Sequence, residues 1–125
     1  RLSLQLAILH KHSGIATFDQ DVFINVVGGI KVSETASDLV VMLAIVSSLR
    51  DKVIPSKWIA FGEVGLTGEV RPVYNSIERL SEAQKQGFEV AIIPKANAPK
   101  KPIKGIKVVT VGYLYQAIQY LLENS

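Results

Sequence analysis

The sequence predicts an α/β or α+β domain in which a mixed sheet packs against helices. Segments with the composition of strands alternate along the chain with segments of helical periodicity. Residues 62–73 contain a glycine at every third position up to 68, and they have the pattern of a hairpin inserted between the strands and helices. The 125 residues are 48% hydrophobic and include no cysteine, so one core of ordinary size is expected without disulfides or thiolate metal sites. We therefore expect residues 1–125 to form a single domain.

The first part of the chain is expected to hold one helix and one strand. Residues 1–12 place apolar side chains at both strand and helix spacing, and their Leu, Gln, Ala and Lys content favours a helix. His10 and His12 stand two apart and do not share a helical face, so no metal site is expected there. Residues 21–27 are mostly β-branched or aromatic and predict a strand, and 30–32 resume an extended conformation after two glycines.

A long central helix is expected to follow and to end near Arg50. Residues 39–46 are apolar on every side, which is typical of a helix buried in the middle of a core. The residues before this run offer three possible N-caps, namely Ser33, Thr35 and Ser37.

The next segment predicts a hairpin. Residues 58–64 have the composition of one apolar strand, and 69–73 form a second short strand. Three glycines supply backbone freedom where the chain reverses or approaches another segment, namely Gly62, Gly65 and Gly68. Pro72 has no backbone N–H, so strand pairing is expected to stop there.

A helix then begins near Asn75 and Glu78, which have the spacing of a capping box. Gly87 is expected to end it. Its apolar stripe is predicted to consist of Ile77, Leu80 and Ala83.

The last third predicts two strands and a helix. Residues 88–93 form a strand closed by Pro94, and 107–111 form another. The intervening residues 95–104 contain prolines and four lysines and are expected to form a surface loop. Residues 113–123 then have one apolar helical face, which consists of Leu114, Ala117, Ile118, Leu121 and Leu122.

Several segments, in this order, resemble the Lon-protease-like domain. The resemblance rests on GEVGLTGEVRPV at 62–73 and IERLSEAQKQGFEVAIIPKAN at 77–97, supported by DVFINVVGGIKVSETASDL at 21–39 and VSSLRD at 46–51. Within this family the chain is most similar to the branch found at the C-terminus of a bacterial DNA repair ATPase. The resemblance implies a fold of the ribosomal protein S5 domain 2 type and a chain cut from a larger ATPase.

Lon-type peptidases use a serine nucleophile and a lysine base, and this sequence departs from both. The family pattern places Ala36 at the serine position and Ile77 at the lysine position. Ser37 is one residue away, about 100° around a helix. Arg79 cannot act as the base because guanidinium stays protonated. No catalytic residue is therefore expected; the alternative is an active Ser/Lys peptidase that uses Ser37 and a nearby lysine in a shifted register.

The resemblance implies a binding and assembly role instead. It implies an oligomeric ring, hexameric in the family's pattern, that serves as a scaffold and binds DNA without sequence preference. The parent ATPase is expected to promote branch migration. The DNA is expected to be single-stranded or branched, and a recombinase is a candidate partner. The chain lacks the Gly-x-x-x-x-Gly-Lys-Ser/Thr phosphate loop, so it is not expected to hydrolyse ATP itself. The resemblance implies ATP, Mg²⁺ and Zn²⁺ in other domains. The chain also lacks an apolar run of about 18 residues, so a cytoplasmic location without a membrane partner is expected.

Six basic residues are the predicted DNA contacts. The net charge of +3 and pI of 9.2 permit a phosphate-binding surface without requiring one. Two alternatives remain: some of these residues form salt bridges between subunits or solvate a loop, or the domain is a structural cap that does not touch DNA. Lys95 and Lys104 extend the loop cluster. The six candidates are Lys31, Arg50, Arg71, Arg79, Lys100 and Lys101.

Overall fold

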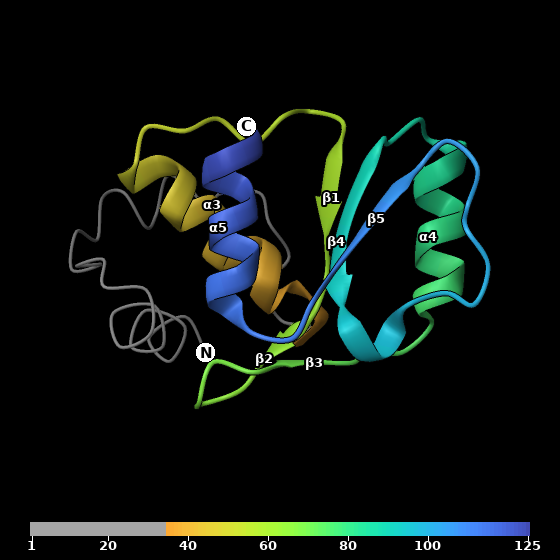
Figure 1. Ribbon diagram of the computed structural model, residues 1–125, viewed down its shortest axis with the longest axis horizontal. Coiled ribbons are helices and arrows are strands. Elements are labelled where there is room, and N and C mark those ends of the chain that lie inside the picture. Colours follow the sequence, from red (N-terminus) through yellow and green to blue (C-terminus); the bar gives the residue numbers. More distant parts are fainter. Residues whose placement is uncertain (1–34) are drawn as a thin grey trace.

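The computed structural model describes residues 35–125. The helix predicted over 1–12, the strands predicted over 21–27 and 30–32, and the candidate Lys31 lie outside the described residues. The described part has three layers built around a parallel sheet (Figure 1). Two helices lie on one face of the sheet and one helix lies on the other, which confirms the predicted α/β class.

The parallel sheet contains β1 (Trp58–Ala60), β4 (Val90–Pro94) and β5 (Lys107–Val111), in the order β1-β4-β5. Strand β4 is central and reads as a continuous apolar run, as expected for a strand covered on both faces. Its register pairs Trp58 with Val90 on one side and Pro94 with Val111 on the other.

Helices α3 (Asp38–Leu49) and α5 (Leu114–Asn124) cover one face of the sheet. A short 3₁₀ turn, η1 (Thr35–Ser37), precedes α3. The prediction of a buried central helix is confirmed, because six apolar residues of α3 are buried in one cluster with β4 and α5: Leu39, Val41, Met42, Leu43, Ile45 and Val46. Ser37 stands at the N-cap position but makes no side-chain cap hydrogen bond.

Helix α4 (Ser76–Lys85) covers the opposite face. Leu80 and Ala83 pack into a second cluster, whereas Ile77 is 55% exposed, so the predicted stripe is wrong at its first member. The helix therefore contacts the core only from its second turn onward. The predicted capping box is also wrong, because Asn75 has a left-handed backbone and makes no side-chain cap hydrogen bond. Gly87 follows the helix with a φ of +86°, as predicted for its end.

The predicted single strand over 58–64 is wrong: the chain leaves the sheet after β1 and enters a separate hairpin. This hairpin pairs β2 (Glu63–Val64) with β3 (Val70–Arg71). Gly62 lies at the break with a φ of +157°, and a Cβ there would lie 2.9 Å from Cγ1 of Val70. Strand β3 ends immediately before Pro72, as predicted.

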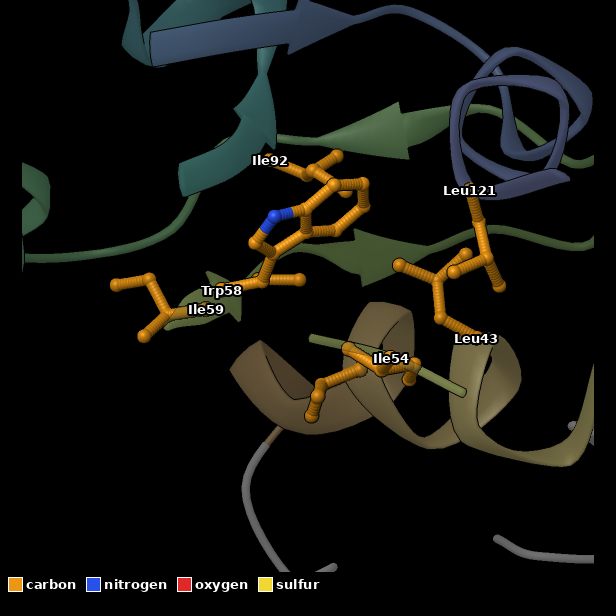
Figure 2. Close-up of a pocket in the computed structure, with 8 residues that line it drawn as sticks. Leu43, Ile54, Trp58, Ile59, Ile92 and Leu121 are labelled. Carbon is orange, nitrogen blue, oxygen red and sulfur yellow. The ribbon is translucent and has the colours of Figure 1, made fainter. Parts of the chain in front are cut away.

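A small apolar pocket lies between α3, α5 and the sheet (Figure 2). Leu43, Trp58 and Leu121 contribute to its walls from three different elements. Its volume of about 20 Å³ is enough for roughly one water, but its lining offers almost no polar partner. We regard it as a packing defect of the core and not as a ligand site.

Candidate nucleic-acid interface

The structure gathers four lysines on the loop that connects β4 to β5. This loop begins with a 3₁₀ turn, η2 (Lys95–Asn97), runs past Pro99 and Pro102, and rejoins the sheet at β5. We call it the lysine loop; its four lysines are all exposed, and they are Lys95, Lys100, Lys101 and Lys104.

The charge of the lysine loop is not neutralised within the described part of the chain. Between residues 35 and 125, the ion pairs found all involve Arg71, and no acidic side chain lies within ion-pair distance of the four lysines. Lys107, at the start of β5, differs because its ammonium nitrogen lies 5.6 Å from the ring centre of Tyr120. The loop thus presents four ammonium groups directly to solvent, which is the arrangement that phosphate binding requires.

Contacts at both ends hold the lysine loop in place. Asn97 accepts a hydrogen bond from the backbone N–H of Val73 at 2.8 Å and donates one to the Val73 carbonyl at 3.3 Å. Near the other end, Nε2 of Gln84 in α4 donates to the carbonyl of Lys104 at 2.6 Å. Ile106 is buried in the cluster beneath α4. Together with the fixed φ of two prolines, these contacts limit the number of conformations available to the lysines.

Arg71 lies apart from the lysine loop, on the hairpin, and its charge is already engaged. Its guanidinium forms ion pairs with Glu63 at 3.4 Å and with Glu69 at 3.0 Å. Hydrogen bonds from the Thr67 side chain and from Arg71, in that order of effect, lower the pKa of Glu69 to about 2. Glu69 in turn raises the pKa of Arg71. The two glutamates belong to the same chain, so this arginine does not depend on a neighbouring subunit for its ion pairs.

The other two predicted DNA contacts within the described residues, Arg79 and Arg50, lie on neither the lysine loop nor the hairpin. Nε of Arg79 donates to the carbonyl of Tyr74 at 3.0 Å, and its guanidinium lies 5.9 Å from the ring centre of Phe61. Arg50 is exposed at the C-terminal end of α3, where its backbone N–H donates to the Val46 carbonyl at 2.9 Å. The structure therefore brings Lys100 and Lys101 together on one loop and leaves Arg50, Arg71 and Arg79 on other elements.

The two positions expected for a Lon-type dyad are in different surroundings. Ala36 is buried in η1, and its carbonyl accepts a hydrogen bond from the Gly62 N–H at 2.9 Å. Ile77 is exposed in the first turn of α4. Neither side chain carries a nucleophile or a base. In the part of the chain that the structure describes, no three His, Cys, Asp or Glu side chains gather as a metal site would require.

Two features of the structure were not found from the sequence. Asp38 is a buried carboxylate; its position in the first turn of a helix is a weak signal, because acidic residues are common there. Tyr113 and Tyr115 stack with ring centres 5.8 Å apart and are about half exposed. Two tyrosines two residues apart do not predict stacking on a helix, and this pair forms because Tyr113 has an extended backbone before α5 begins.

Comparison with known proteins matches residues 4–97 to a family model described as subunit ChlI of Mg-chelatase. Similar curated proteins are named DNA repair protein RadA. The chain is 57% identical over 123 residues to the one from Pseudomonas aeruginosa, 54% over 118 residues to that of Escherichia coli, and 33% over 123 residues to that of Mycobacterium tuberculosis.

These matches cover 98%, 94% and 98% of this chain but only 27%, 26% and 25% of the three relatives. The chain therefore spans about a quarter of the length of the curated relatives it matches. The family model does not carry the Lon name, so the Lon-like resemblance stays a prediction. In the described residues, no helix has the length and apolar character needed to cross a membrane.

Proposed function

We propose a function from the premise that this chain belongs to the family described as subunit ChlI of Mg-chelatase and is homologous to a segment of bacterial RadA proteins. In this proposal it is a non-proteolytic, Lon-like module of a DNA repair and recombination ATPase. It scaffolds a homo-oligomeric ring, hexameric by resemblance, and holds single-stranded or branched DNA without sequence preference. The larger protein would use ATP, Mg²⁺ and Zn²⁺ in other domains, promote branch migration and work beside a recombinase.

The observation that carries the DNA-binding part is the lysine loop. Four ammonium groups without acidic partners in the described chain lie on a loop braced by Asn97 and Gln84. Contacts between lysine and phosphate supply most of the affinity of non-specific nucleic-acid binding because they release counterions. Arg71 is a weaker candidate for the same role, since a phosphate would have to compete with Glu63 and Glu69.

Exposed apolar side chains support the scaffold part of the proposal. Tyr74, which precedes α4, is 84% exposed, and Ile77 is exposed in the first turn of that helix. At the tip of the hairpin, Leu66 is exposed, and the stacked pair of Tyr113 and Tyr115 is also open to solvent. Large apolar side chains that gather at the surface often mark protein–protein contacts. These groups are the natural places for a neighbouring subunit to pack.

The non-proteolytic part rests on residue chemistry. An alanine at 36 cannot attack a carbonyl, and an isoleucine at 77 cannot accept a proton. An assay with a fluorophosphonate probe and casein checks this part, and turnover above background would restore the alternative of an active peptidase.

The lack of cysteine in the sequence suits a reducing compartment such as the cytoplasm, where we place the protein.

Fluorescence anisotropy with a labelled single-stranded oligonucleotide, titrated with salt, tests the DNA-binding part. Replacing Lys100 and Lys101 together by alanine should weaken binding and reduce the magnitude of the salt slope by about 1.4, which is roughly 0.7 for each lost phosphate contact on single strands. Lys85→Ala is the matched control, because this exposed lysine lies in the last turn of α4 and outside the loop. Equal slopes for the double variant and the wild type would reject the lysine loop, and a wild-type chain that does not bind would favour a structural cap.

A further inference from the structure

A groove of about 390 Å³ lies between the lysine loop and β5 and is open to solvent. Val108 and Thr110 border it from the strand, and residues 98–103 and Ile106 border it from the loop side. Its volume falls within the range of roughly 300–1,000 Å³ that is typical of small-molecule sites. Most of its border is apolar, and the residues that line it are Ala98, Pro99, Lys100, Pro102, Ile103, Ile106, Val108 and Thr110.

We propose that this groove takes one unpaired nucleobase of a single DNA strand, while Lys100, Lys101 and Lys104 hold the flanking phosphates. The inference rests on the proposed DNA-binding function and names the part of the ligand that the groove would read. Charge complementarity supports this occupant, because Lys100 lines the groove and is free of acidic partners in residues 35–125. A nucleotide combines an apolar base with an anionic backbone, and this surface combines an apolar hollow with a basic rim.

The walls of the groove suit the faces of a base. Pro99 and Pro102 offer flat, rigid rings, and Ile103 and Val108 offer branched aliphatic surface. Extruded bases are held by stacking between aromatic or apolar side chains, so such walls can replace part of the stacking that a base loses. A base inside a duplex is already stacked and paired, so it would have to be extruded from the duplex before it could enter the groove. The groove therefore favours single strands and junctions over intact duplex.

Polar groups are also available for the edge of a base. The backbone N–H of Lys107 donates to the Glu89 carbonyl at 2.8 Å, toward β4. Because backbone groups alternate in direction along a strand, those of Val108 and Thr110 face the outer edge of β5. In the described sheet no strand pairs with that edge. The Thr110 side chain, which is exposed, adds a hydroxyl that can donate and accept a hydrogen bond.

The test compares oligonucleotides that differ only in whether they carry bases. We would measure the affinity of the full chain for a short oligothymidylate and for a strand of equal length made of abasic sites. The wild type should bind the base-bearing strand several-fold more tightly, because the apolar walls of the groove would remove the faces of one base from water. Thr110→Leu, which fills the groove from an exposed position, should bring this ratio close to one and leave the affinity for the abasic strand unchanged.

Two further variants keep the test decisive. Ala98→Leu narrows the groove from the loop side and replaces Thr110→Leu if the latter lowers the thermal unfolding midpoint. Val53→Leu is the matched control, because it enlarges an exposed apolar side chain that does not line the groove, and it should keep the wild-type ratio.

Three results would overturn the inference: equal wild-type affinity for both strands, a wild-type ratio in both groove variants, or loss of the ratio in Val53→Leu. If the wild type binds both strands equally and the Lys100/Lys101 double variant still binds more weakly, the result rejects the base site in the groove. The proposed binding of phosphates by the lysine loop would be supported. If the wild type binds neither strand, the proposed DNA-binding function falls as well.

Discussion

The buried carboxylate of Asp38 accepts a hydrogen bond from the backbone N–H of Val64 at 3.1 Å. Asp38 is the first residue of α3 and is only 1% exposed, and Val64 lies in the hairpin. Two backbone bonds on either side reinforce this contact: the Gly62 N–H donates to the Ala36 carbonyl, and the Leu39 N–H donates to the Gly62 carbonyl. The start of the central helix is thereby joined to the segment that follows β1.

We expect Asp38→Ala to lower the free energy of unfolding by about 1–3 kcal/mol, because the Val64 N–H would lose its acceptor in a buried site. Urea denaturation followed by circular dichroism measures this change. Asp38→Asn keeps an oxygen acceptor of similar shape and should lose less. If the alanine variant is as stable as the wild type, this contact does not stabilise the helix start.

We expect Gly62→Ala to destabilise the domain by more than about 1 kcal/mol, because its φ of +157° is rare for a residue with a Cβ and because that Cβ would clash with Val70. Thermal and urea unfolding report the loss. The control is Gly112→Ala, where the nearest atom to a new Cβ is a flexible glutamine oxygen at 3.6 Å. Similar stability losses in the two variants would contradict the steric argument.

The depressed pKa of Glu69 predicts a dependence of stability on pH. Its value of about 2 lies below the ordinary 4.5, so the carboxylate stabilises the folded state fully above pH 4.5, and this contribution disappears as the pH falls toward 2. Thr67→Val should move the pKa of Glu69 upward toward its ordinary value, because the largest cause of the shift is the Thr67 hydrogen bond. A carboxyl-detected NMR titration measures it directly. Thr67→Ser keeps the hydroxyl and should keep the low pKa. A low pKa in the valine variant would show that Arg71 and the backbone hydrogen bond to Glu69 are sufficient without the hydroxyl.

We expect the chain to form a closed ring whose mass in sedimentation equilibrium is a multiple, six by resemblance, of its 13.6 kDa. Replacing Tyr113 and Tyr115 together by serine should shift the population toward smaller species, because it removes exposed apolar surface. Lys85→Ala, on the exposed side of α4, should leave the mass unchanged. A wild-type monomer at all concentrations would mean that assembly depends on other parts of the protein.

The periodicity of the sequence predicted the buried helix α3, strand β5 with its observed bounds, and helix α5 to within one residue. These elements follow local rules, because each buries a complete apolar face. The strand over 58–64 could not be resolved by such rules: Phe61 before Gly62 and Val64 after it both predict burial, and the break depends on contacts with η1 and Val70. Ile77 was misplaced for a similar reason, because the helical pattern does not show where the sheet beneath it ends.

For the candidate site, the sequence identified the basic residues but not which of them already have partners within the chain. Arg71, Arg79 and Lys100 look alike in a list of basic residues. Only the fold shows that Glu63 and Glu69 surround Arg71, that Arg79 lies over Phe61, and that the lysine loop faces solvent. The groove beside β5 could not be predicted from the sequence either, because it forms between segments whose apolar residues predict only burial.

The parallel arrangement of β1, β4 and β5 also bears on how the chain reaches this structure. Each sheet contact joins strands separated by a helix or a long loop, as in the pairing of Trp58 with Val90. The only tight hairpin in the described residues, β2–β3, lies outside this sheet. Sheet formation therefore cannot spread from a local turn and must wait for distant segments to meet, which makes loop closure the slow step. We expect refolding to be slow for a domain of this size, with the hairpin free to form early.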